Sequence, residues 1–129
     1  MSPLLPLGVD ILELKKASAF YSRHRARLST LFHPGELAFV TASAKPSEAF
    51  AFVFAAKEAV FKALDAPYLG IEGFRDIHLF PKKNFSFRLS GRLKKKLSFS
   101  SALKISFRKT KRHLIATCHP AFVKPCVGI

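Results

Sequence analysis

Residues 77–129 of this sequence contain no acidic residue. All eight Asp and Glu residues lie in residues 1–76, where nine of the 22 Lys and Arg residues leave a net charge of only +1. Residues 77–129 hold the other thirteen basic residues and carry +13. The resulting positive potential favours an anionic partner: a phosphorylated ligand, an acidic protein, a nucleic acid or an anionic membrane. A basic face that serves only solubility is the alternative.

The chain lacks the cysteine and histidine patterns of a metal site. Cys118 and Cys126 lack CxxC spacing, so the sequence indicates neither a zinc site nor a disulfide framework, and we expect reduced thiols. The histidines also lack the spacing of metal ligands. They are His24, His33, His78, His113 and His119.

Long hydrophobic runs are also missing. No window approaches the roughly 20 apolar residues of a membrane span. The N-terminal stretch lacks a basic segment and reaches Asp10 and Glu13 early, unlike a signal peptide. Because 49% of the 129 residues are hydrophobic, we expect a single domain over residues 1–129 with a substantial core, in a cytoplasmic protein.

The first half of the chain is mainly helical in pattern. Residues 8–14 alternate around Val9 and Ile11, which indicates a short strand, and a basic helix is expected from about residue 15 to 31. The sequence at 33–35 breaks this helix, and a shorter one is expected from Glu36. A further helix is expected to begin near Ser47, as its cap, and to end before Pro67.

The second half is mainly extended in pattern. Apolar and polar residues alternate in residues 84–91 and again in residues 103–108, and residues 113–118 are expected to form a returning strand. The chain has fourteen phenylalanines and no tryptophan, which favours a core built from phenylalanine contacts. We therefore predict an α+β domain with a long central helix packed on an antiparallel sheet.

The central helix contains the stretch FAAKEAVFKAL, residues 54–64, which is apolar on two opposite sides. A helix of this kind is expected to be buried. Glu58 and Lys62 lie together on the narrow strip between those sides. Lys57 points from the middle of an apolar stripe, so its stem is expected to pack among phenylalanines while its ammonium reaches a cleft.

Two interpretations of these charges remain open from the residues alone. Glu58 and Lys62 can form an ordinary i,i+4 pair, which contributes only about 0.2–0.5 kcal/mol to a helix. Alternatively, Glu58 binds a metal or accepts a proton beside an ammonium that neutralises phosphate charge. A Mg²⁺ site needs a second carboxylate, for which Asp10 is the natural candidate.

Four motifs occur in order: GVDILEL at 8–14, HPGEL at 33–37, FAAKEAVFKAL at 54–64 and LGIEGFRDI at 69–77. Together they resemble the short bacterial holo-[acyl-carrier-protein] synthases of the 4′-phosphopantetheinyl transferase family. The resemblance implies transfer of 4′-phosphopantetheine from coenzyme A to a serine of an acyl carrier protein, with release of 3′,5′-ADP. Short members of the family are typically homotrimers with active sites between subunits.

The resemblance also assigns roles to individual residues. Asp10 and Glu58 match the carboxylates that bind Mg²⁺, with Glu58 also the base, directly or through a water. Lys62 matches the lysine beside the reacting phosphate, and Lys57 a lysine that faces the coenzyme phosphates. Glu36 matches an acid with a supporting role. Carrier proteins of this type are acidic, and five residues match the carrier-docking helix: Lys15, Lys16, Arg23, Arg25 and Arg27.

The chain departs from the family pattern at three places. The SxSH motif of the last hairpin is replaced by residues 106–109, where Arg108 and Lys109 can substitute for the missing histidine as phosphate contacts. The basic residues expected before FxxKEA are replaced by Phe52 and Val53, and the GKP motif is replaced by residues 82–84. A family member that binds its ligands without turnover is therefore one alternative.

A second alternative is a nucleic-acid-binding module. The basic second half with interleaved phenylalanines fits this class. Against it, the sequence has no RNP-like or helix-turn-helix signature, and many phenylalanines fall on the apolar side of expected strands. We therefore do not expect nucleic acid as the partner.

Overall fold

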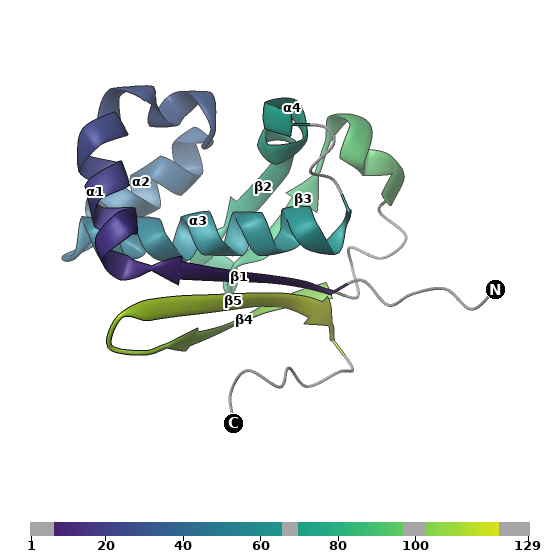
Figure 1. Ribbon diagram of the computed structural model, residues 1–129. Coiled ribbons are helices and arrows are strands. Elements are labelled where there is room, and N and C mark those ends of the chain that lie inside the picture. The colour runs from purple at the N-terminus through teal and green to yellow at the C-terminus, as the bar shows by residue number, and fades with distance from the viewer. Residues whose placement is uncertain (1–6, 66–69, 97–102, 122–129) are drawn as a thin grey trace.

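A computed structural model of the chain describes residues 7–65, 70–96 and 103–121 (Figure 1). Within residues 7–65 lie one strand, three α-helices and a 3₁₀ segment: β1 (Gly8–Glu13), α1 (Leu14–His24), η1 (Arg25–Thr30), α2 (Pro34–Ala42) and α3 (Pro46–Ala63). The described residues from 70 onward form a short helix, four strands and two 3₁₀ segments: α4 (Gly70–Arg75), β2 (Ile77–Phe80), η3 (Pro81–Lys83), β3 (Ser86–Leu89), η4 (Gly91–Lys96), β4 (Leu103–Lys109) and β5 (His113–Pro120).

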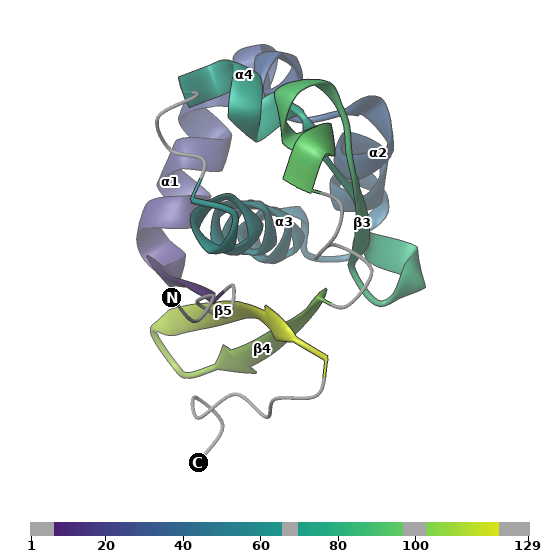
Figure 2. The same cartoon turned by 90° about the vertical axis from the view of Figure 1, so that its right-hand side faces the viewer.

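The long helix α3 lies at the centre of the molecule. An antiparallel sheet of order β1-β5-β4 packs on one side of it, and the β2–β3 hairpin and α4 lie on the other (Figure 1). Seen along its axis, α3 is surrounded by the sheet, α1, α2, β3 and α4 (Figure 2). The predicted α+β class, with a long central helix on an antiparallel sheet, is confirmed.

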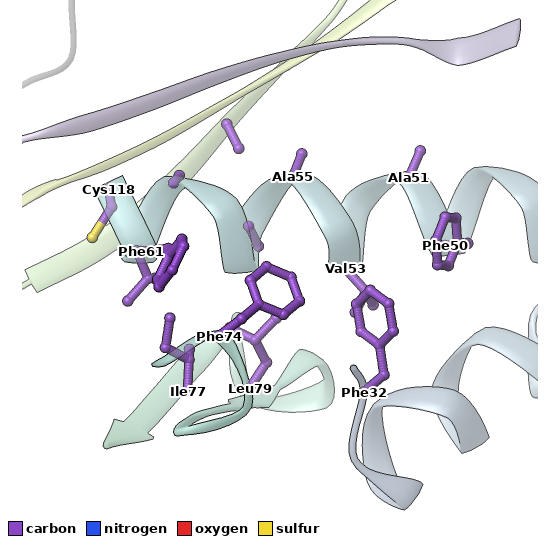
Figure 3. Close-up of a cluster of buried hydrophobic side chains, with 14 of the residues drawn as sticks. Phe32, Phe50, Ala51, Val53, Ala55, Phe61, Phe74, Ile77, Leu79 and Cys118 are labelled. Atoms are coloured by element: carbon purple, nitrogen blue, oxygen red, sulfur yellow. The ribbon is translucent and has the colours of Figure 1, made fainter. Parts of the chain in front are cut away.

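Residue size decides which side of α3 meets which neighbour. Ala51 and Ala55 point toward the strands, and both are fully buried (Figure 3). Phenylalanine rings fill the space on the opposite side, where Phe32, Phe61 and Phe74 lie between α3 and the segments below it in the view. Small side chains therefore bring the sheet close to the helix backbone, and large aromatic ones fill the wider gap.

The sheet approaches the backbone of α3 closely at Gly8. A Cβ atom added to Gly8 would overlap the carbonyl oxygen of Ala59 and the backbone nitrogen of Ala63. Asp10, two residues further, faces α3 as well and is 9% exposed. The apolar residues of β1 consequently face outward, with Val9 36% and Ile11 64% exposed. The expected strand is present, but its apolar side is turned away from α3.

The boundaries of three expected helices differ from the prediction. The basic helix expected over residues 15–31 is α-helical only to His24 and continues as the 3₁₀ segment η1. The next helix begins at Pro34 rather than Glu36, and α3 begins at Pro46. Ser47 is therefore inside α3 and is not its cap. Both prolines occupy the first turn, where their missing N–H groups are not needed.

The structure also contains a strand that the sequence did not reveal. β2 has only four residues and pairs with β3, so its alternation is too short to separate from the preceding helix. The strands expected from residues 84–91, 103–108 and 113–118 are confirmed as β3, β4 and β5. No helix in the described part of the chain is long and apolar enough to cross a membrane.

Candidate active site

Asp10 and Lys62 meet where β1 crosses the C-terminal half of α3. Lys62 Nζ donates a hydrogen bond to Asp10 Oδ1 at 3.0 Å and contacts the carbonyl oxygen of Val9 at 3.3 Å. The side chain of Asp10 is 12% exposed and that of Lys62 is 45% exposed, so the pair lies at the edge of the core. The ammonium is thus held by β1 and remains open to solvent.

Glu58 lies one turn before Lys62 and is half-buried. Burial raises the pKa of the Glu58 carboxyl, the charge of Asp10 raises it further, and Lys62 lowers it. The i,i+4 interpretation predicted an ion pair between Glu58 and Lys62, but among the described residues Lys62 pairs with Asp10. The three side chains therefore form one electrostatic cluster drawn from two elements that are distant in sequence.

A cavity of about 190 Å³ opens beside Glu58. Among the described residues that line this cavity, Glu58 is charged and the others are apolar or glycine: Leu31, Phe54, Phe61, Gly70, Ile71 and Phe74. An apolar wall strengthens electrostatic interactions at the carboxylate because it excludes water. This arrangement can bind and deprotonate a hydroxyl group next to a neutralising cation.

The cluster also fits a divalent cation. No group of three or more His, Cys, Asp and Glu side chains in the described residues could hold a metal ion. Mg²⁺, however, is commonly bound by one or two carboxylates, with waters and substrate phosphates completing its shell. Burial is the main cause of the raised pKa of Glu58 and repulsion from Asp10 adds to it; a cation between the two carboxylates would remove that repulsion.

Lys57 lies elsewhere, which corrects its expected role at the coenzyme phosphates. Its side chain is fully buried, and its ammonium pairs with Glu36 Oε1 at 2.9 Å rather than reaching a cleft. Glu36 also accepts hydrogen bonds from the backbone N–H groups of His33 and Leu79. Glu36 and Lys57 therefore lie together in the core, where Lys57 cannot touch a ligand.

Lys109 lies at the other end of α3. Its ammonium donates a hydrogen bond to Glu48 at 2.6 Å, and this bond lowers the pKa of the Glu48 carboxyl. Fourteen residues separate Glu48 from Lys62 on α3, which at about 1.5 Å per residue is about 20 Å. Arg108 is half-buried on the adjacent position of β4. Within one chain, these two basic residues are therefore not part of the cluster around Glu58.

A second cavity, of about 460 Å³, lies beside the Glu48–Lys109 pair. Its lining combines aromatic rings with charged groups at the start of α3: Phe39, Phe52, Phe85, Lys45 and Glu48, with Ser43, Ala44 and Ala49. Sequence reasoning missed both Glu48 and this cavity. The replacement of a basic residue by Phe52 before the FxxKEA motif was the available signal.

The five basic residues expected to dock a carrier protein are all exposed on one continuous stretch of chain. Lys15, Lys16 and Arg23 lie on α1, and Arg25 and Arg27 lie on η1. Arg25 also lies over the ring of Tyr21, 5.3 Å from its centroid. The stretch ends at the Leu31 wall of the Glu58 cavity, so a protein bound along it would reach that cavity.

Comparison with known proteins agrees with the motifs. The chain is 36% identical over 107 residues to the holo-[acyl-carrier-protein] synthase of Wolinella succinogenes, covering 80% of this chain and 87% of the relative. It is 38% identical over 76 residues to the synthase of Moorella thermoacetica, covering 59% of this chain and 59% of that relative's length.

Solved structures show the same fold. The structure of Helicobacter pylori holo-[acyl-carrier-protein] synthase in complex with coenzyme A superposes with a TM-score of 0.68 at 27% identity, covering 88% of this chain and 98% of that chain. The Neisseria meningitidis synthase superposes with a TM-score of 0.71 at 24% identity, covering 91% of this chain and 98% of that chain. The family model that matches, over residues 6–118, is described as the 4′-phosphopantetheinyl transferase superfamily. The chain therefore belongs to the 4′-phosphopantetheinyl transferase superfamily.

Proposed function

We propose that this protein is a holo-[acyl-carrier-protein] synthase that transfers 4′-phosphopantetheine from coenzyme A to a serine of an acyl carrier protein. The observation that carries the proposal is the cluster of Asp10, Glu58 and Lys62, in which Glu58 also lines a cavity. The synthases of Wolinella succinogenes and Helicobacter pylori, similar to this chain over most of its length, support it.

The reaction requires a base and a cation at one place. The serine oxygen attacks the β-phosphorus of coenzyme A, the bond from that phosphorus to the bridging oxygen breaks, and 3′,5′-ADP leaves. Glu58 accepts the serine proton, and burial suits it to this because the raised pKa makes the carboxylate a stronger base. Lys62, oriented by Asp10, stabilises negative charge on the reacting phosphate.

Mg²⁺ is the proposed cofactor, and Asp10 and Glu58 would hold it. When bound, it supplies positive charge that neutralises the pyrophosphate of coenzyme A. A carboxylate has two oxygens, so Glu58 can bind the ion and still accept a proton. In the described residues no third His, Cys, Asp or Glu side chain joins Asp10 and Glu58. Substrate phosphates and waters would therefore complete the shell of the ion.

We infer that the nucleotide of coenzyme A binds in the second cavity. Aromatic walls suit a purine base, and Lys45, Lys109 and the neighbouring Arg108 offer charge for its phosphates. This cavity and Lys62 are about 20 Å apart along α3, so nucleotide contacts from one chain and the Glu58 cluster of another can share one active site.

A homotrimer would bring the second cavity of one chain next to the Glu58 cluster of another. The outward face of the sheet, unlike an ordinary solvated face, exposes apolar side chains: Leu7, Val9 and Ile11. Next to them in the sheet, the hydroxyl of Thr117 is buried without a hydrogen-bond partner among the described residues. We propose that other copies of the chain cover this face. Mixing inactive Glu58→Gln and Lys109→Glu chains should then restore activity.

The acidic carrier protein is proposed to dock on the basic stretch formed by α1 and η1, where its charge would speed encounter. We also propose that the reaction takes place in the cytoplasm.

The test is mass spectrometry of an acidic apo-carrier protein incubated with this protein, coenzyme A and Mg²⁺. The phosphopantetheine mass increase should appear, and should be lost in Glu58→Gln and in Asp10→Ala. Glu13→Gln is the matched control, because Glu13 lies on the same strand and pairs only loosely with Lys16 at 3.8 Å. Retention on single-stranded DNA together with no thermal stabilisation by coenzyme A and Mg²⁺ would favour a nucleic-acid-binding protein instead.

A further inference from the structure

The ammonium of Lys57 has an unusual set of neighbours. Besides Glu36, it donates a hydrogen bond to the backbone carbonyl of Leu31 at 3.0 Å. It also lies 5.3 Å from the ring centroid of Phe32 and 5.1 Å from that of Phe74, distances at which a cation is attracted to an aromatic face. One buried charge thus contacts three chain segments other than its own.

Two of those neighbours are walls of the Glu58 cavity. Leu31 follows η1 and Phe74 belongs to α4, and both residues line the cavity and also contact Lys57. Glu58 is the next residue of α3. The same helix therefore presents a carboxylate to the cavity and, one residue earlier, an ammonium to two residues that line it.

We propose that Lys57 is a positioning residue: its ammonium ties Leu31 and Phe74 together and so fixes the cavity around Glu58 in the shape that transfer requires. The effect of Lys57 on turnover rests on the proposed function. The ordering of Leu31 and Phe74 by Lys57 does not depend on it. Lys57 is fully buried and cannot touch substrate, so it acts only through its neighbours.

A purely stabilising role explains these contacts less well. Burial lowers the pKa of Lys57 even though Glu36 opposes this effect, which shows that the core is an unfavourable place for the charge. Apolar residues of similar volume often replace buried ion pairs without loss of stability. Methionine would fill the space between Phe32 and Phe74, but it could not donate to the Leu31 carbonyl. Directional contacts are what the ammonium adds.

The glutamate extends the same network into the rest of the core. Glu36 accepts from Lys57 and the His33 N–H through one oxygen and from the Leu79 N–H through the other. These bonds attach the ammonium to the start of α2 and to β2. His33 in turn contacts the carbonyl oxygen of Arg75, at the end of α4, at 2.6 Å. Hydrogen bonds of this network thereby connect the cavity walls to α2 and β2.

The experiment compares wild type, Lys57→Met, Glu36→Gln/Lys57→Met and Val40→Ala. Val40 is a fully buried residue of α2 that lines none of the cavities described above, so its truncation is a control for general destabilisation. Thermal unfolding, kcat and KM for coenzyme A, and hydrogen exchange of the 25–33 and 70–76 segments are measured for each variant, well below its Tm.

Lys57→Met should lower both Tm and kcat, because it leaves the Glu36 carboxylate buried without its ammonium. The double variant removes both charges and should recover most of the Tm, but its kcat should stay roughly 10- to 100-fold below wild type, with KM for coenzyme A changed less than about threefold. Exchange of both segments should remain faster than in wild type. Val40→Ala should change Tm alone.

Recovery of kcat together with Tm in the double variant would overturn the proposal, because the pair would then serve stability only. If wild type shows no transfer, the proposed function fails, and hydrogen exchange decides the positioning role by itself. Faster exchange of both segments in the double variant than in Val40→Ala supports that role, and equal exchange refutes it.

Discussion

Replacing Gly8 by alanine should separate β1 from α3. The added Cβ would overlap the Ala59 carbonyl oxygen and the Ala63 nitrogen and would lie 3.0 Å from the Ala63 Cα. All three obstacles are backbone atoms of the central helix, so they cannot rotate away as a flexible side chain can. The strand must move outward instead, which strains its pairing with β5.

The cost follows from that geometry. Overpacking a core with a methyl group usually costs about 1–3 kcal/mol, and contact with immobile backbone places Gly8→Ala at the upper end or above, at about 3 kcal/mol. For a domain of this size this corresponds to a fall in Tm of roughly 10–15 °C. Asp10 lies two residues further on the same strand, so transfer activity should fall as well.

Thermal and urea unfolding of Gly8→Ala and Gly35→Ala are the assay. Gly35 is the matched control because nothing lies within 4 Å of its added Cβ and it is inside α2. Gly35→Ala should be neutral or more stable by up to about 1 kcal/mol. A Tm of Gly8→Ala within about 2 °C of wild type would show that the sheet is not held as close to α3 as described.

Three further outcomes are expected. Glu58→Gln should lower kcat by roughly 10²–10⁴-fold, and the wild-type rate should fall as the pH drops through the raised pKa of Glu58, where the carboxylate becomes protonated. The same substitution should raise Tm at neutral pH, because the fold favours the uncharged form of this side chain; an unchanged pH profile and Tm would place Glu58 in ordinary solvent. Arg23→Glu and Arg25→Glu should each lower kcat/KM for the carrier roughly 10-fold at low salt while leaving kcat unchanged, whereas Lys94→Glu on η4 should not, as stopped-flow kinetics at two ionic strengths can measure. Burial raises the pKa of the Cys118 thiol to about 12, so peptide mapping after alkylation at pH 8 should find Cys118 modified roughly 10³-fold more slowly in native protein than in urea.

The sequence predicts the fold class well because periodicity carries it. The alternation in β3 and β4, the expected return of the chain in β5 and the two apolar sides of α3 are local patterns, and the structure contains each of these elements. Periodicity does not predict short elements, because the four residues of β2 are too few to establish a period. Helix starts at Pro34 and Pro46 were missed by one or two residues, as expected where a proline begins the first turn.

The candidate site was found in part. Glu58 and Lys62 could be placed on one strip of a helix, and Asp10 was the natural second acid, and the structure brings all three together. Lys57 could not be placed, since its partner Glu36 lies 21 residues earlier in the chain. Local geometry also suggested that Lys62 would pair with Glu58, whereas a strand 52 residues away supplies its partner. Contacts between residues distant in the sequence decide both cases, and the local patterns of one sequence do not reveal such contacts.

The pairing of β1 with β5 has a consequence for how the protein is made. Residues 8–13 leave the ribosome well before residues 113–118, so they gain this hydrogen-bonded neighbour only roughly 100 residues later. Until then Asp10 has no strand to hold it against Lys62. The cluster is thus among the last features to assemble during synthesis, and a nascent chain that stalls before β5 would carry every residue of the cluster without being able to use them.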